Sequence, residues 1–137
     1  MPKKVSKVKK ISKIKQLKKD LNLPDYAIDF NADINGTCLV GHLDTNYKQL
    51  KKLFGEPEES DGCKVSGEWV FKDRTSKDVF TVYDWKQTDL YDTGYPSVDE
   101  FRDSDSNYAF SVGGHNSKKM EAEKFIAWMK TQLDKRF

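Results

Sequence analysis

The chain has 137 residues, enough for one domain. Hydrophobic residues make up 36% of it and charged residues 34%, so we expect a small core in which aromatic side chains supply much of the buried area. No apolar run approaches the roughly 18–20 residues of a membrane span, and the N-terminus lacks the apolar stretch of a secretory signal. These features argue against a membrane or secreted protein and favour a soluble one from a reducing compartment.

The charge is divided between two parts of the chain. Residues 1–19 contain nine lysines and no acid, so they carry +9, and because the whole chain carries +2, residues 20–137 carry −7. A basic terminal segment on an acidic body is typical of segments that meet polyanions. The predicted nucleic-acid or partner-binding residues are therefore Lys3, Lys4, Lys7, Lys9, Lys10, Lys13, Lys15, Lys18 and Lys19.

Apolar residues recur at every third position of this segment, which we call the basic arm (residues 1–23). They are Val5, Val8, Ile11, Ile14 and Leu17. A helix of 3.6 residues per turn would spread them around its surface, which weakens an amphipathic-helix interpretation. The spacing indicates that the arm buries something, whereas the simplest alternative is a solubilising tail without folded structure.

Residues 24–137 are expected to form a single α+β domain. The first elements of this body are a strand over residues 37–43, after a tight Asn-Gly turn, and a helix over residues 47–54. Asp44 or Thr45 would cap the helix, and the glycine that follows it would end it.

Two further strands are predicted over residues 63–73 and 79–86. Trp69 and Phe71 alternate onto one face of the first strand, and a short polar turn joins it to the second, which is the pattern of a hairpin. The two cysteines, Cys38 and Cys63, are compatible with a disulfide that a chain of this size does not require.

A connection of about 20 residues, 87–106, follows the hairpin. Loops of this length are uncommon unless they are functional or partly structured, and Ser97 with Glu100 forms a capping box that predicts a helical turn. A strand over residues 107–114 and a final helix capped by Asn116 or Ser117 complete the chain. The helix places one apolar face toward the core, made of Ala122, Phe125, Ile126, Met129 and Leu133.

The order β-α-β-β-loop-β-α predicts an α+β fold. We expect a three- to four-stranded antiparallel sheet with two helices packed on one face, preceded by the basic arm.

The patterns that could carry chemistry are weak. Asp103 and Asp105 begin a calcium-loop spacing, but Tyr108 replaces its glycine and Gly114 its closing acid, so a solvated acidic turn is the simpler interpretation. His42 has acids nearby in the sequence, yet no nucleophile or phosphate-loop motif is present. We therefore expect no catalytic residue, no metal site and no cofactor.

Residues 87–106 also form a candidate protein-binding loop. Aromatic residues alternate with acids there, and Trp and Tyr often anchor interfaces. The predicted contact residues are Tyr91, Tyr95, Phe101, Asp99, Asp103 and Asp105, with Asp89, Asp92 and Glu100 beside them. Such a loop would suit a basic partner or serve as a docking site for the arm itself.

Four short motifs carry a resemblance. The pattern Y-x-x-L-x-x-x-F-G-x-P (residues 47–57), Trp69, YDWK (residues 83–86) and V-G-G before the last helix resemble small uncharacterised proteins of phages and large DNA viruses. The resemblance covers about residues 41–130, without the arm. It implies a viral origin and a small α+β fold, and nothing catalytic.

Three functional hypotheses remain open. The favoured one is a non-enzymatic viral binding or structural protein, in the virion or the host cytoplasm or nucleus, whose arm engages an assembly partner or nucleic acid. Nine lysines would give such an arm sequence-independent, salt-sensitive affinity for phosphates. The second is an inhibitor of a host factor that acts through the acidic loop as a nucleic-acid mimic, and the third is a small enzyme.

Overall fold

The structure is a computed structural model that describes residues 26–59 and 62–137. In this part of the chain, five strands form one antiparallel sheet in the order β1-β3-β4-β5-β2. The strands are β1 (Tyr26–Ile28), β2 (Thr37–Thr45), β3 (Glu68–Asp73), β4 (Val79–Tyr83) and β5 (Tyr108–His115). The helices are α2 (Tyr47–Phe54), α3 (Val98–Asp103) and α4 (Lys119–Arg136), and a 3₁₀ turn, η1 (Asn116–Lys118), precedes α4.

The α+β class and the antiparallel sheet are confirmed, but the predicted numbers of strands and helices are wrong. β1 adds a fifth strand because its three residues pair with the end of β3, from Tyr26 opposite Asp73 to Ile28 opposite Phe71. A segment this short carries no periodicity from which it could be recognised. α3 adds a third helix where the capping box predicted only one helical turn.

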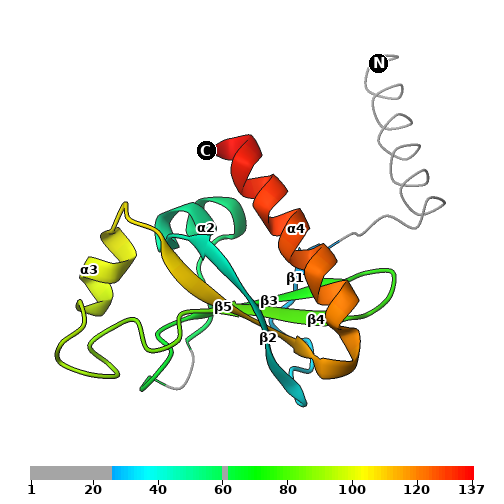
Figure 1. Cartoon of the computed structure of the whole chain (residues 1–137), viewed down its shortest axis with the longest axis horizontal. Helices are drawn as coiled ribbons and strands as arrows, with labels where there is room; N and C mark the ends of the chain where they lie inside the picture. Colours follow the sequence, from blue (N-terminus) through cyan, green and yellow to red (C-terminus); the bar gives the residue numbers. More distant parts are fainter. Residues whose placement is uncertain (1–25, 60–61) are drawn as a thin grey trace, which may run out of the picture.

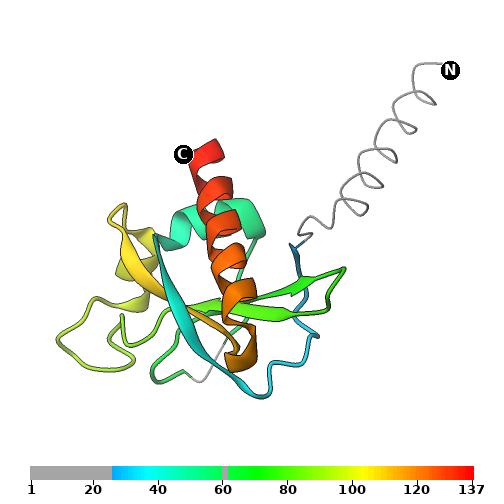
Figure 2. The same cartoon turned by 45° about the vertical axis from the view of Figure 1, so that its right-hand side comes forward.

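α2 and α4 pack on the same face of the sheet, and the core lies between them and the sheet (Figures 1 and 2). Alternating residues of β3 and β4 point into this core, among them Trp69, Phe71 and Phe80, each 1% exposed. Phe125 of α4 stacks on Phe80 with ring centroids 4.8 Å apart. The predicted hairpin and its inward-facing aromatic residues are therefore confirmed.

α2 begins and ends on local signals. Asn46, rather than Asp44 or Thr45, caps it, because the Asn46 side chain accepts a hydrogen bond from the backbone N–H of Gln49. Gly55 ends it with a positive φ (+83°), which glycine adopts readily, and its N–H donates to the carbonyl of Lys51.

α4 begins after η1 without a side-chain cap, so the predicted capping by Asn116 or Ser117 is wrong. Its core face is confirmed by Ala122, Phe125, Met129 and Leu133, which are buried. β2 passes beneath this helix at Gly41, where an added Cβ would lie 2.5 Å from Cδ1 of Ile126. Glycine at this position lets the strand and the helix approach closely.

Candidate functional site

Residues 87–106, which we call the acidic segment, leave the sheet after β4 and return to it at β5 (Figure 1). Hydrogen bonds within the segment shape its first half. Asp89 N donates to the carbonyl of Pro96 (2.8 Å), and Tyr95 N donates to the carbonyl of Asp92 (3.1 Å). Thr88 is only 2% exposed and its carbonyl accepts from Tyr91 N (3.0 Å). The first half of this long connection therefore has a defined, hydrogen-bonded backbone and is not an extended loop.

The second half of the segment is α3, which is fastened to the core by Phe101. The predicted cap at Ser97 is confirmed, because Ser97 Oγ accepts a hydrogen bond from Glu100 N (3.1 Å). Phe101 is 1% exposed, and its ring packs 4.9 Å from Tyr108 and 5.7 Å from Phe110. The prediction that Phe101 contacts a partner is wrong, since its side chain is part of the core.

Large apolar side chains remain exposed along the first half of the segment and immediately before it. Trp85 is 42% exposed, Leu90 41%, Tyr91 42% and Tyr95 45%. The rings of Tyr91 and Tyr95 lie 5.9 Å apart, and Lys86 Nζ lies over both Tyr91 (4.8 Å) and Trp85 (5.4 Å). Single exposed apolar residues are ordinary, but a group of neighbouring ones marks an interaction surface.

The backbone turns sharply where this group begins. Lys86 has a left-handed conformation (φ +57°), and its N–H donates to the carbonyl of Lys64 (2.6 Å). Left-handed backbone is unfavourable for a lysine and persists only where surrounding contacts hold it. This turn directs the chain away from β4 and into the exposed group.

The acidic segment also contains the whole net negative charge of the folded body. Residues 26–137 hold twenty acids and fifteen lysines or arginines, a net charge of −5. Residues 87–106 hold six acids and one arginine, which is also −5. The net charge of the rest of the body is therefore zero.

Two of the predicted acids are engaged in ion pairs. Lys48 of α2 lies 3.1 Å from Asp105 and 3.6 Å from Asp103, and all three side chains are largely exposed. The hydrogen bond to Asp105, with the charges of both acids, raises the pKa of Lys48. Exposed pairs of this kind contribute little to stability. Asp99, also predicted, is exposed on α3.

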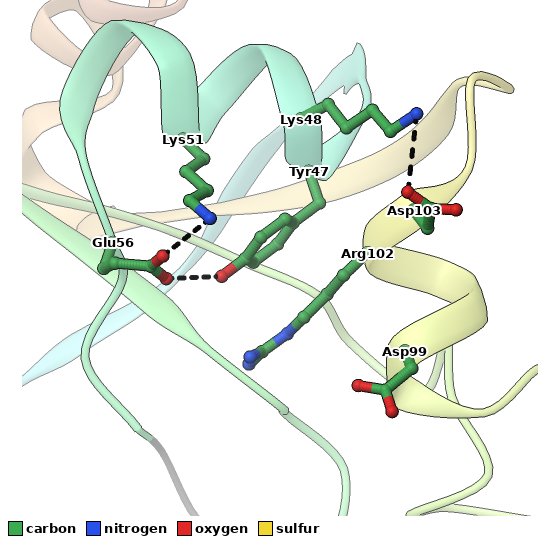
Figure 3. A pocket seen from close by; sticks show the side chains of 7 residues that line it. All are labelled: Tyr47, Lys48, Lys51, Glu56, Asp99, Arg102 and Asp103. Atoms are coloured by element: carbon green, nitrogen blue, oxygen red, sulfur yellow. Dashed lines mark hydrogen bonds and ion pairs between the residues drawn. The ribbon is translucent and has the colours of Figure 1, made fainter.

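A cleft of about 410 Å³ lies between α2 and α3, and the sequence did not indicate it (Figure 3). Its lining residues are Tyr47, Lys48, Lys51, Glu56, Asp99, Arg102 and Asp103. On the α2 side, Glu56 accepts a hydrogen bond from the Tyr47 hydroxyl (3.0 Å) and pairs with Lys51 (2.8 Å). The hydrogen bonds from Lys51 and Tyr47 lower the pKa of Glu56.

Arg102 of α3 reaches across this cleft. Its guanidinium lies 4.8 Å from the centre of the Tyr47 ring, and Nη2 donates to the carbonyl of Ser66 (3.1 Å). Asp99 and Arg102 both extend from α3 toward the cleft (Figure 3). Because the lining contains three bases and three acids, its charges balance, and the arrangement serves to hold α3 against α2.

A buried carboxylate holds the segment before β3, which Arg102 contacts at Ser66. Asp84 is 2% exposed, and its oxygens accept hydrogen bonds from the N–H groups of Ser66 (3.0 and 3.1 Å) and Gly67 (3.0 Å). Burial raises the pKa of Asp84, and the hydrogen bonds oppose this effect in part. The Asp84 carboxylate therefore serves as an acceptor for backbone amides.

The chain has two histidines and two cysteines, none of which was predicted to form a site. His42 lies on β2 opposite Ser111, and His115 lies at the other end of this strand pair, opposite Thr37. Cys38 and Cys63 are exposed and form no disulfide. In residues 26–59 and 62–137, no group of three or more His, Cys, Asp or Glu side chains could hold a metal ion. The nine arm lysines lie outside the described residues.

No protein-family model matches the chain, and no curated protein matches it. None of the helices in the described part is both long and apolar enough to cross a membrane.

Proposed function

We propose that the chain is a non-enzymatic binding protein with two oppositely charged contact regions. The acidic segment, with Trp85 beside it, docks on a partner protein that presents positive charge. The basic arm contacts a polyanion, either nucleic acid or an acidic protein surface. In view of the resemblance to viral proteins, we place this activity in a virion or in its assembly.

The observation that carries the proposal is the coincidence of two surface features on one segment. The acidic segment has a net charge of −5 and exposes Leu90, Tyr91 and Tyr95. Aromatic side chains supply binding energy at the centre of an interface, and complementary charge around them selects the partner and speeds association. Phe101 and the Ser97 cap hold the segment in a defined shape, which lowers the entropy cost of binding.

The second hypothesis, an inhibitor that mimics nucleic acid, has less support. A mimic needs carboxylates free to replace phosphates, and Lys48 already pairs with Asp103 and Asp105. The exposed aromatic side chains suit a protein interface better than they suit a row of phosphate-like charges.

Nuclear magnetic resonance of the full ¹⁵N-labelled chain can test both contact regions with two defined probes. Random-sequence duplex DNA should shift signals of residues 1–23, because lysine side chains pair with its phosphates. Poly-L-lysine should instead shift signals of residues 85–103. Both effects should weaken as salt increases from about 50 to about 300 mM, because salt screens exposed charges. DNA that left residues 1–23 unchanged, or poly-L-lysine that left residues 85–103 unchanged, would contradict the proposal.

A further inference from the structure

We propose that the acidic segment of one copy of this protein binds the basic arm of a second copy, so that copies join head to tail. This inference rests on the proposed function, because it names the partner that the acidic segment takes. It concerns the same surface and adds the identity of its occupant.

The first support is charge complementarity within the chain. The first 19 residues carry +9, the acidic segment carries −5, and the remainder of residues 26–137 is neutral. The acidic segment therefore carries a net negative charge equal to that of the whole body, and this charge attracts a basic ligand. The arm is the most basic part of the same chain, and each copy supplies one arm and one acidic segment.

The second support is the apolar content of both regions. The arm places a valine, isoleucine or leucine between its lysines at every third position. The acidic segment exposes Leu90, Tyr91 and Tyr95 among its carboxylates, and Trp85 lies beside them. Since exposed ion pairs alone contribute little, burial of apolar side chains between the charges is needed for a stable contact. Both regions offer such side chains.

The third support is where the two regions leave the sheet. The arm precedes Tyr26, which pairs with Asp73 at one end of β3. The acidic segment follows β4, whose last residue, Tyr83, pairs with Glu68 at the other end of β3. The six residues of β3 span about 17 Å. β1 and α3 accordingly lie at opposite sides of the body in both views (Figures 1 and 2).

This placement favours a second copy over the arm's own body. An arm that bound its own acidic segment would use about five extended residues to cover the length of β3, and these residues would be withdrawn from the contact. In a second copy the arm and the acidic segment meet directly. Because the two contact regions differ, the interface is heterologous, and such interfaces generate rings or open chains.

Two charge variants and one control can test the arrangement. The arm variant replaces the nine arm lysines by glutamine. The segment variant removes four charges and keeps the shape of the side chains: Asp89→Asn, Asp92→Asn, Asp99→Asn and Glu100→Gln. The control removes four charges elsewhere on the exposed surface: Asp44→Asn, Glu59→Gln, Glu123→Gln and Asp134→Asn. Circular dichroism establishes that each variant is folded, and nuclease treatment removes nucleic acid.

Sedimentation velocity at about 50 mM salt should show species larger than a dimer for the wild type and the control as concentration rises. The arm variant alone and the segment variant alone should remain monomers. Their mixture should form a one-to-one dimer and nothing larger, because one copy supplies the only arm and the other the only acidic segment. Raising the salt to about 500 mM should weaken association at least tenfold.

Three results would overturn the inference: a wild type that stays monomeric, a segment variant that associates as the wild type does, or a mixture that stays monomeric. A monomeric wild type in which poly-L-lysine still shifts residues 85–103 would refute self-assembly and leave the proposed function intact. If poly-L-lysine also left the signals of residues 85–103 unchanged, the proposed function would be refuted as well.

Discussion

Tyr47→Phe should make the stability of the protein less sensitive to alkaline pH. Tyr47 is 5% exposed, and its hydroxyl donates a hydrogen bond to Glu56 (3.0 Å). Burial, with a further effect of this hydrogen bond, raises the pKa of Tyr47 from 10.0 to about 12. The phenol therefore loses its proton at a lower pH in the unfolded chain than in the folded protein.

The sign and size of the effect follow from this difference. A pKa that is raised in the folded state contributes stability that is fully present below pH 10 and is lost as the pH rises through about 12. One pKa unit corresponds to about 1.4 kcal/mol, so at pH 11 the wild type should have lost about 1.4 kcal/mol that the variant cannot lose. At pH 8 the variant lacks one hydrogen bond and should be about 1 kcal/mol less stable. The wild type and the variant should therefore have nearly the same free energy of unfolding near pH 11.

Urea denaturation of the wild type and the variant at pH 8 and pH 11 measures this difference. Tyr95→Phe is the matched control, because Tyr95 is 45% exposed and its substitution should leave the free energy of unfolding nearly unchanged at both pH values. A difference between wild type and Tyr47→Phe that stayed constant with pH would show that the hydroxyl is not buried against Glu56.

Three other substitutions probe the framework of the site, each by urea denaturation. Asp84→Ala should lower the free energy of unfolding by about 2–3 kcal/mol, because two buried N–H groups lose a charged acceptor; a change below 1 kcal/mol would contradict this. Phe101→Ala should lower the free energy of unfolding by about 3–5 kcal/mol, whereas Tyr95→Ala should lower it by less than about 1 kcal/mol. Equal losses of stability in the two variants would contradict the burial of Phe101. Gly41→Ala should lower the free energy of unfolding by about 1–3 kcal/mol. Adding Ile126→Val should restore part of this stability, because valine lacks the Cδ1 atom that the new Cβ meets.

The sequence alone was sufficient to predict the elements that depend on local signals. Helix α2 was recognisable from its spaced apolar residues and from Gly55, and α3 from its capping box. The hairpin of β3 and β4 was recognisable from alternating aromatic residues that the structure places in the core. Each of these signals lies within a few residues of the element it predicts. The division of charge is likewise a property of the sequence and needs no fold.

The tertiary structure decided the features that depend on residues far apart in the chain. β1 exists because β3 offers it an edge, and Asn46 is held at the start of α2 by a side-chain contact with Asn107 (3.2 Å), 61 residues away. Phe101 is buried because α3 packs against the rings of β5, and a helix of six residues is too short for its pattern to reveal a buried face. The contact between the Tyr91 and Tyr95 rings also required the fold, because the hydrogen bond from Asp89 N to the carbonyl of Pro96 folds this part of the segment back on itself.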